Sequence, residues 1–234
     1  MKDGSIPIII PGIFPDKQET SKSWSDKDYV QYDAVTNCRS AGIIPYTIHN
    51  NKLQFLLQKI DNPVKKKYSG WNDFGGKQID LNETTASTAA REFSEETSCL
   101  FYLKETNDDT LYNQLKDNTD LNYNENVIEE LRKLIPKSQK YYHDKITKYI
   151  SPVNISSKET YISYFVNVPY LPSSDLPRAE DIHINYDEKY LRTCQWFTLD
   201  ELMNLSDKDF HKRLQITRIQ YRINNYNTKG LFTI

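Results

Sequence analysis

A double glycine, followed by a short polar loop and a glutamate-rich helix, constrains the fold of this chain most strongly. Glycine has no side chain, so Gly75 and Gly76 permit a tight turn or a close approach of two backbones. Residues 84–98 are predicted to form a helix that Thr84 or Thr85 caps. Its buried face is predicted from apolar residues at helical spacing, namely Ala86, Ala89, Ala90 and Phe93.

Three carboxylates on this helix are candidates for metal ligands. Glu92, Glu95 and Glu96 are spaced by three and four residues, which places them on roughly one helix face. Like charges at this spacing repel unless a cation lies among them, and carboxylate oxygens suit Mg²⁺ or Mn²⁺. The alternative is a solvated helix face with incidental acids. The nearby double glycine, the central Arg91 and the preceding Glu83 favour the metal site.

The remaining sequence predicts a sheet, an insertion and a closing helix. Strands are expected at residues 40–48 and 53–59, which form a hairpin, and at 141–150, 160–168 and 193–198. Pro45 is expected at an edge or a bulge. Residues 105–138 are expected to be an insertion with helices at 110–116 and 125–134, the second stopped by Pro136. A last helix is expected from Asp207, with Phe210, Leu214 and Ile223 inward. The order indicates an α+β fold or an α/β/α sandwich with a mixed sheet.

The segment from Gly76 to Cys99 resembles the Nudix box, and residues 39–204 resemble that family more loosely. The resemblance implies a Nudix-type α/β/α sandwich with a mixed β-sheet and a helical insertion. We expect a Nudix domain over residues 35–234 and an N-terminal arm over residues 1–34. Two features depart from the box. Six residues, rather than five, separate Gly76 from Glu83, and Ser98 stands where a glycine is expected, which makes a left-handed exit from the helix more costly.

The resemblance also implies an activity, which is metal-dependent cleavage of a phosphoanhydride bond in a nucleoside diphosphate-linked or related substrate. It implies Mg²⁺ or Mn²⁺ ligation by carboxylates, with Glu83, Glu92, Glu95 and Glu96 as the candidates. Arg91 would hold Glu83 in a salt bridge, and Glu95 and Glu96 would take part in catalysis. The general base would be Glu96 within the box or Glu188 on a later loop, although Glu188 also reads as a solvent-exposed loop acid.

Candidate substrate contacts surround the double glycine. Lys65, Lys66 and Lys67 precede it and could reach a polyphosphate, with Gly75 and Gly76 beside them, but a lysine run is usually a solvated loop. Lys212, Arg213, Arg218 and Arg222 give the last helix a basic face that either follows an RNA backbone or faces water. The partner is expected to be a diphosphate-containing small molecule or capped RNA, and the sequence leaves a homodimer open.

Two rival functions share the fold. One is a Nudix-fold nucleotide- or RNA-binding module without turnover, which would be expected to lose glutamates that are present here. The other is an isomerase of isoprenoid diphosphates, which needs a catalytic cysteine. Cys38 and Cys194 lack a recognisable context for that role, and Cys99 is predicted to lie in the core. Metal-dependent hydrolysis would separate the hydrolase from both.

Composition sets the cellular expectations. The 234 residues carry a formal net charge of −2, which argues against a dedicated nucleic-acid coat. The 3 cysteines are widely spaced and give no disulfide framework, so a reducing compartment is expected. The apolar run at Ile8–Ile10 is too short for a signal peptide or a membrane span. These features predict a soluble, cytoplasmic protein.

Overall fold

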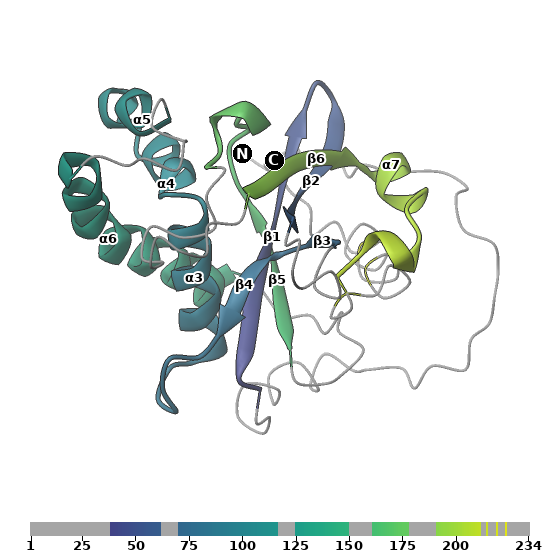
Figure 1. Ribbon diagram of the computed structural model, residues 1–234, viewed down its shortest axis with the longest axis horizontal. Helices are drawn as coiled ribbons and strands as arrows, with labels where there is room; N and C mark the ends of the chain where they lie inside the picture. Colours follow the sequence, from purple (N-terminus) through teal and green to yellow (C-terminus); the bar gives the residue numbers. More distant parts are fainter. Residues whose placement is uncertain are drawn as a thin grey trace, which may run out of the picture.

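The computed structural model describes residues 38–61, 70–116, 125–149, 161–177 and 191–211, together with Leu214, Ile219 and Ile223. A mixed sheet of six strands lies between two groups of helices, as Figure 1 shows. The chain therefore has the expected α+β architecture with a mixed sheet and a helical insertion. The N-terminal arm at residues 1–34 lies outside the described residues.

The predicted hairpin forms the start of the sheet. Strand β1 (Ser40–His49) pairs antiparallel with β2 (Lys52–Asp61). Asn50 and Asn51 form the turn, with φ of 51° and 59°. Two left-handed residues give a two-residue turn the twist that a hairpin needs, and asparagine tolerates this region well.

Strand β1 lies inside the sheet rather than at its edge. One side pairs antiparallel with β4 (Phe74–Lys77) as far as Ile43 and then with β2 from Tyr46. The other side pairs in parallel with β5 (Ile162–Asn167). Pro45 lies where β1 changes partners from β4 to β2. The expected edge position for Pro45 is therefore wrong. Proline has no amide hydrogen to donate to a neighbouring strand, and Pro45 lies between the residues of β1 that pair with β4 and those that pair with β2.

Strand β2 joins the two remaining strands to the sheet. It pairs antiparallel with β6 (Leu191–Thr198) over eight residue pairs and with the short β3 (Trp71–Asn72) near its end. The strands expected at residues 160–168 and 193–198 thus correspond to β5 and β6.

Two hydrophobic cores cover the two faces of the sheet. Successive β1 residues point to opposite faces, so Ala41 and Ile43 join one core while Ile44 and Tyr46 join the other. The first core lies under the helices α3 (Thr85–Glu96), α4 (Leu100–Glu105), α5 (Asp109–Lys116) and α6 (Glu125–Tyr149). The second lies under α7 (Leu199–Met203), and α7 is seen on the other side of the sheet in Figure 1.

Helix α6 corrects two sequence-based predictions. It runs through Pro136, which was expected to end it, and it includes most of residues 141–150, which were expected to form a strand. Its buried residues recur at helical spacing and pack on α3 and its neighbours; they include Leu131, Leu134, Ser138, Tyr142 and Ile146. Packing of this face outweighs both the missing proline donor and the strand preference of the tyrosines and isoleucine.

The last helix, which was expected to begin at Asp207, starts further along the chain. A 3₁₀ turn spans Asp207–Asp209, and Ile219 and Ile223 are helical. Another 3₁₀ turn, at Ser173–Asp175, lies between β5 and β6. Phe210, Leu214 and Ile223 are buried, as predicted. The basic residues expected on the outer face, from Lys212 onward, lie outside the described residues. Within the described part of the chain, no helix is both long and apolar enough to cross a membrane.

Replacing Leu131 tests the inward face of α6. Leu131 on α6 is fully buried in the first core. Leu131→Ala is therefore expected to lower the free energy of unfolding by about 2–5 kcal/mol. Leu81→Ala is the matched control, because Leu81 is 81% exposed and its loss should change stability by about 0.5 kcal/mol or less. Urea denaturation measures both, and equal midpoints in the two variants would contradict this packing.

Candidate functional site

Helix α3 is anchored to the sheet at its first turn. The Thr84 side chain caps the helix by accepting a hydrogen bond from the Ser87 amide at 3.1 Å, as the sequence predicted. The next residue, Thr85, shares a buried hydrogen bond of 2.8 Å with the Tyr164 hydroxyl on β5. These contacts fix where the glutamates of α3 lie relative to the strands.

Arg91 connects the loop before α3, strand β4 and the glutamates. Its Nε donates to Glu83 at 2.8 Å and its Nη2 donates to the Lys77 carbonyl at 2.8 Å. Its Nη1 lies 2.9 Å from Glu92 Oε1 and 3.2 Å from Glu95 Oε2. The Arg91 side chain is only 10% exposed. The salt bridge implied between Arg91 and Glu83 is therefore present, and the same guanidinium also compensates two further carboxylates.

The charges of this pair are held in place by their surroundings. Burial raises the pKa of Glu83, but hydrogen bonds from Arg91 and from the Ile79 amide outweigh burial, so the pKa is lowered. Burial lowers the pKa of Arg91, but Glu83, Glu92 and Glu95 more than offset it and leave the pKa above its usual value. Both groups therefore stay ionised at neutral pH.

A second arginine, which the sequence analysis missed, holds Glu96. Arg192 on β6 donates from Nη1 to the Glu96 carbonyl at 2.8 Å and from Nη2 to Glu96 Oε1 at 3.2 Å. Gln58 Nε2 donates to the other oxygen of Glu96 at 2.8 Å. The Arg192 side chain is fully buried. The signal was available, because Arg192 lies on the same face of β6 as the inward-facing Cys194 and Trp196, where a charge requires a partner.

The double glycine allows strand β4 to pass close to its neighbours. A Cβ atom on Gly76 would collide with the carboxylate of Glu92, and one on Gly75 would collide with the Tyr161 hydroxyl. That hydroxyl in turn donates to the fully buried Asp73 at 2.9 Å. Glycine at residue 76 thus leaves room for the Glu92 carboxylate to lie against the strand.

The exit from α3 is left-handed without a glycine. Thr97 caps the helix, and Ser98 and Cys99 follow with φ of 48° and 59°. The Cys99 amide donates to the Ser94 carbonyl at 2.9 Å. This hydrogen bond satisfies one of the carbonyl groups that lack a donor within the helix at its C-terminal end. The expected left-handed turn is thus formed by residues for which that conformation costs roughly 1–2 kcal/mol each.

None of the three cysteines forms a disulfide. Cys99 is fully buried in the first core, as predicted, and Cys38 is buried as well. Burial raises the pKa of Cys99 to about 12 and the pKa of Cys194 to about 12. Both thiols therefore stay protonated, and unreactive as nucleophiles, near neutral pH.

The chemistry of the donor set fits a hard divalent cation, because α3 and its loop present only carboxylate oxygens. As the side chains stand, however, the described residues contain no group of three or more His, Cys, Asp or Glu close enough to hold a metal ion. Glu92, Glu95 and Glu96 are turned toward the two arginines instead. Lys65, Lys66, Lys67 and Glu188 lie outside the described residues.

This geometry defines an α+β domain in which a glutamate-rich helix is tied to a mixed sheet by two buried arginines. The chain is 60% identical over 215 residues to the uncharacterized protein L534 of Acanthamoeba polyphaga mimivirus, which covers 86% of this chain and 70% of that protein. The chain belongs to the same family as that mimivirus protein. No family model matches it.

Two solved structures have similar arrangements at a TM-score of 0.38. One is a binary complex of the C. elegans Ap4A hydrolase, 11% identical, which covers 82% of this chain and 97% of that one. The other is the NUDIX domain of Shewanella oneidensis NrtR complexed with ADP ribose, 14% identical, which covers 88% of this chain and 99% of that one.

Removing the Arg91 guanidinium is expected to destabilise the domain. Arg91→Met leaves three partly buried carboxylates without their shared cation, so the free energy of unfolding should fall by about 3 kcal/mol. Arg132→Met on the exposed face of α6 loses only a surface ion pair and should cost about 0.5 kcal/mol or less. Urea denaturation at pH 7 compares the two, and a similar small loss in both would contradict the connecting role of Arg91.

Stability should depend on pH through Glu83. Because its folded-state pKa is lowered, its contribution is present above the unfolded-state pKa and is lost as pH falls through the folded-state pKa. The free energy of unfolding should therefore decrease between about pH 5 and pH 3. Urea denaturation across this range should show a shallower decrease for Glu83→Gln than for the wild type. Glu130→Gln, at an exposed site on α6, should keep the wild-type slope, and identical slopes in all three proteins would exclude Glu83 as the source.

Proposed function

We propose that this protein is a metal-dependent hydrolase of the Nudix type, which cleaves a phosphoanhydride bond in a nucleoside diphosphate-linked or related substrate. The observation that carries the proposal is the position of Glu92, Glu95 and Glu96. These side chains are 18%, 17% and 12% exposed, so they are largely covered yet reachable from solvent. The carboxylate of Glu92 lies against Gly76, a residue whose backbone a ligand can approach closely.

The proposed metal is Mg²⁺ or Mn²⁺, with Glu92, Glu95 and Glu96 as the residues that would hold it. When bound, such an ion neutralises phosphate charge and lowers the pKa of a coordinated water. Glu83 was a fourth candidate ligand from the sequence. Since it accepts from Arg91 and from the Ile79 amide, we assign it the role of an anchor for Arg91.

Metal binding requires a local rearrangement that the contacts of Arg91 make feasible. The Nη1 atom lies between Glu92 and Glu95, and these two carboxylates would have to turn toward Glu96. Arg91 itself need not move, because Nε and Nη2 remain bound to Glu83 and to the Lys77 carbonyl. The arginine thus holds the helix in place while two of its carboxylates exchange one cation for another.

Glu96 is the proposed proton acceptor within the box. Its two carboxylate oxygens accept from Arg192 and Gln58, so the side chain has a fixed orientation at the end of α3. A positioned carboxylate can take the proton from an attacking water at the moment the new bond to phosphorus forms. Gly75 and Gly76 are proposed to contact the substrate phosphates, with Lys65, Lys66 and Lys67 as further candidates and Glu188 as the alternative base.

One observation favours a second function, a nucleotide-binding module without turnover. The two arginines already compensate the glutamates of α3, so the helix is stable without a divalent ion. Such a module would bind nucleotides equally well with and without metal. Measured hydrolysis separates it from the enzyme.

The decisive assay uses a panel of diphosphate compounds, with Mg²⁺, with Mn²⁺ and with EDTA. The panel contains NADH, ADP-ribose, diadenosine polyphosphates, nucleoside triphosphates, capped RNA and inositol pyrophosphate. Metal-dependent release of product from one class would support the hydrolase and identify its substrate. A folded protein that cleaves none of them would support the binding module.

Variants of the glutamates test the assignment on the substrate so identified. Glu95→Gln and Glu96→Gln keep the side-chain shape but remove the charge, so each should lower turnover at least about a hundredfold while the protein stays folded. Glu130→Gln is the control, since Glu130 lies on the exposed face of α6 and should keep wild-type turnover. Circular dichroism monitors folding. Full activity in both site variants would refute the assignment.

A further inference from the structure

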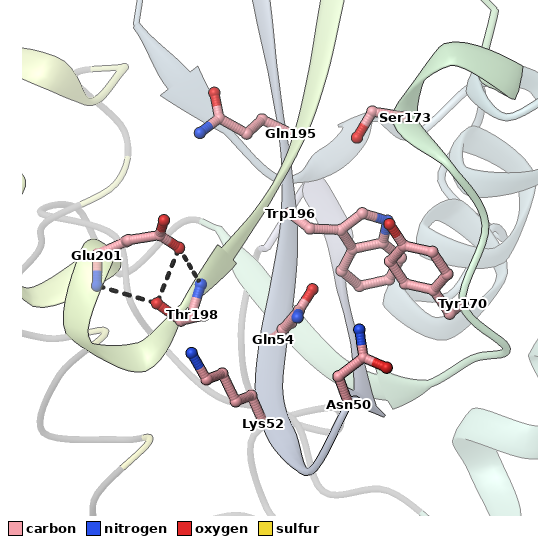
Figure 2. Close-up of a pocket in the computed structure, with 9 residues that line it drawn as sticks. All are labelled: Asn50, Lys52, Gln54, Tyr170, Ser173, Gln195, Trp196, Thr198 and Glu201. Atoms are coloured by element: carbon pink, nitrogen blue, oxygen red, sulfur yellow. Dashed lines mark hydrogen bonds between the residues drawn. The ribbon is translucent and has the colours of Figure 1, made fainter.

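A pocket of about 400 Å³ lies at the turn end of the β1–β2 hairpin, away from the glutamates of α3. Its wall is built from the hairpin, the end of β6, the segment that follows β5 and the first turn of α7, as Figure 2 shows. This volume falls within the range of roughly 300–1,000 Å³ that small-molecule sites occupy. The pocket is therefore large enough for a ligand of the size of a nucleotide.

Two aromatic rings form one side of the pocket. The indole of Trp196 is held by a hydrogen bond of 2.7 Å from Nε1 to the Leu171 carbonyl. The ring of Tyr170 lies 5.6 Å from it, and His49 stacks on Tyr170 at 3.7 Å with an angle of 7° between the planes. His49 covers one face of Tyr170, and the ring is 37% exposed, so its remaining surface stands at the rim where a ligand can contact it.

Polar groups from separate elements border the same space. Side-chain amides reach it from the hairpin turn and from β2, through Asn50 and Gln54, whereas the side chain of the lining residue Gln195 points away from the aromatic rings. Each amide offers both donors and an acceptor, which matches the mixed edge of a nucleobase. Aromatic surface next to two amides is a combination that can recognise a heteroaromatic base.

The pocket also contains a cation suited to a phosphate group. Lys52 lines it opposite the aromatic rings, as Figure 2 shows. Hydrogen bonds from the Thr198 amide and hydroxyl, together with the charge of Lys52, lower the pKa of Glu201. Glu201 is therefore a fixed carboxylate that can accept from an amino group on a base, and Lys52 can bind an anion.

This pocket is separate from the candidate hydrolase site. Gln54 lines the pocket and Gln58 contacts Glu96, and four residues along a strand correspond to about 13 Å. Leu56, between them on the same face, is fully buried, and Trp196 packs edge-on against Phe101 at 6.3 Å. Core side chains therefore fill the space between the two sites.

We propose that this pocket binds a free purine nucleoside monophosphate. The base packs against Tyr170 and Trp196 with its edge toward the amides, and the phosphate pairs with Lys52. A monophosphate has no phosphoanhydride bond, so its binding here does not depend on the hydrolase activity.

Isothermal titration of the full chain with AMP, GMP, adenosine and inorganic phosphate, all in EDTA, tests the proposal. A saturable AMP or GMP isotherm is expected, with no binding of inorganic phosphate alone. Tyr170→Ala should weaken both AMP and adenosine roughly tenfold, whereas Tyr170→Phe should retain binding. Lys52→Gln should weaken AMP roughly tenfold but leave adenosine unchanged. Lys137→Gln, an exposed lysine on α6, is the matched control and should bind AMP like the wild type.

Three outcomes would overturn the proposal. They are the absence of saturable binding up to millimolar nucleotide, equal binding of inorganic phosphate, and AMP affinity that neither Tyr170→Ala nor Lys52→Gln changes. Circular dichroism of each variant establishes that a lost isotherm does not come from unfolding. Tyr170→Phe supplies a second folded variant at the same position.

Discussion

The Arg91 guanidinium is the contact on which the geometry of the site depends. Within one planar group it joins the loop carboxylate of Glu83, the backbone of β4 at Lys77, and two glutamates of α3. No other side chain type offers five donors in a fixed fork with a permanent charge. Because the group is nearly buried, its loss would leave carboxylates that water cannot fully solvate.

Electrostatic balance also explains how so many acids are tolerated on one short helix. Arg91 compensates the first part of the glutamate cluster, and Arg192 compensates Glu96 at the end of α3. A divalent ion would therefore compete with arginine contacts rather than enter an unbalanced acidic site. In the proposed hydrolase, activity would depend on metal because the glutamates of α3 must exchange their arginine contacts for the divalent ion before they can hold it together.

The sequence predicted most elements near the site and failed where packing decides. The β1–β2 hairpin, the Thr84 cap and the buried face of α3 follow local signals, namely turn residues, a side-chain acceptor and apolar spacing. Helix α6 was mispredicted because Pro136 and its tyrosines oppose a helix locally, while burial against α3 favours one. Local preferences are worth less than the burial of a complete helix face.

The sequence by itself determined the carboxylates, their spacing on α3, the implied pair of Arg91 with Glu83 and the glycine at residue 76. The carboxylates of α3 lie on one continuous helix, so helical periodicity relates them directly, and the pair of Arg91 with Glu83 follows from the resemblance to the Nudix box. Only the tertiary structure brought Arg192 to Glu96, 96 positions apart in the chain, and placed the aromatic pocket at the far end of the hairpin. Strand pairing decides such contacts, because register between distant segments depends on which faces are buried together.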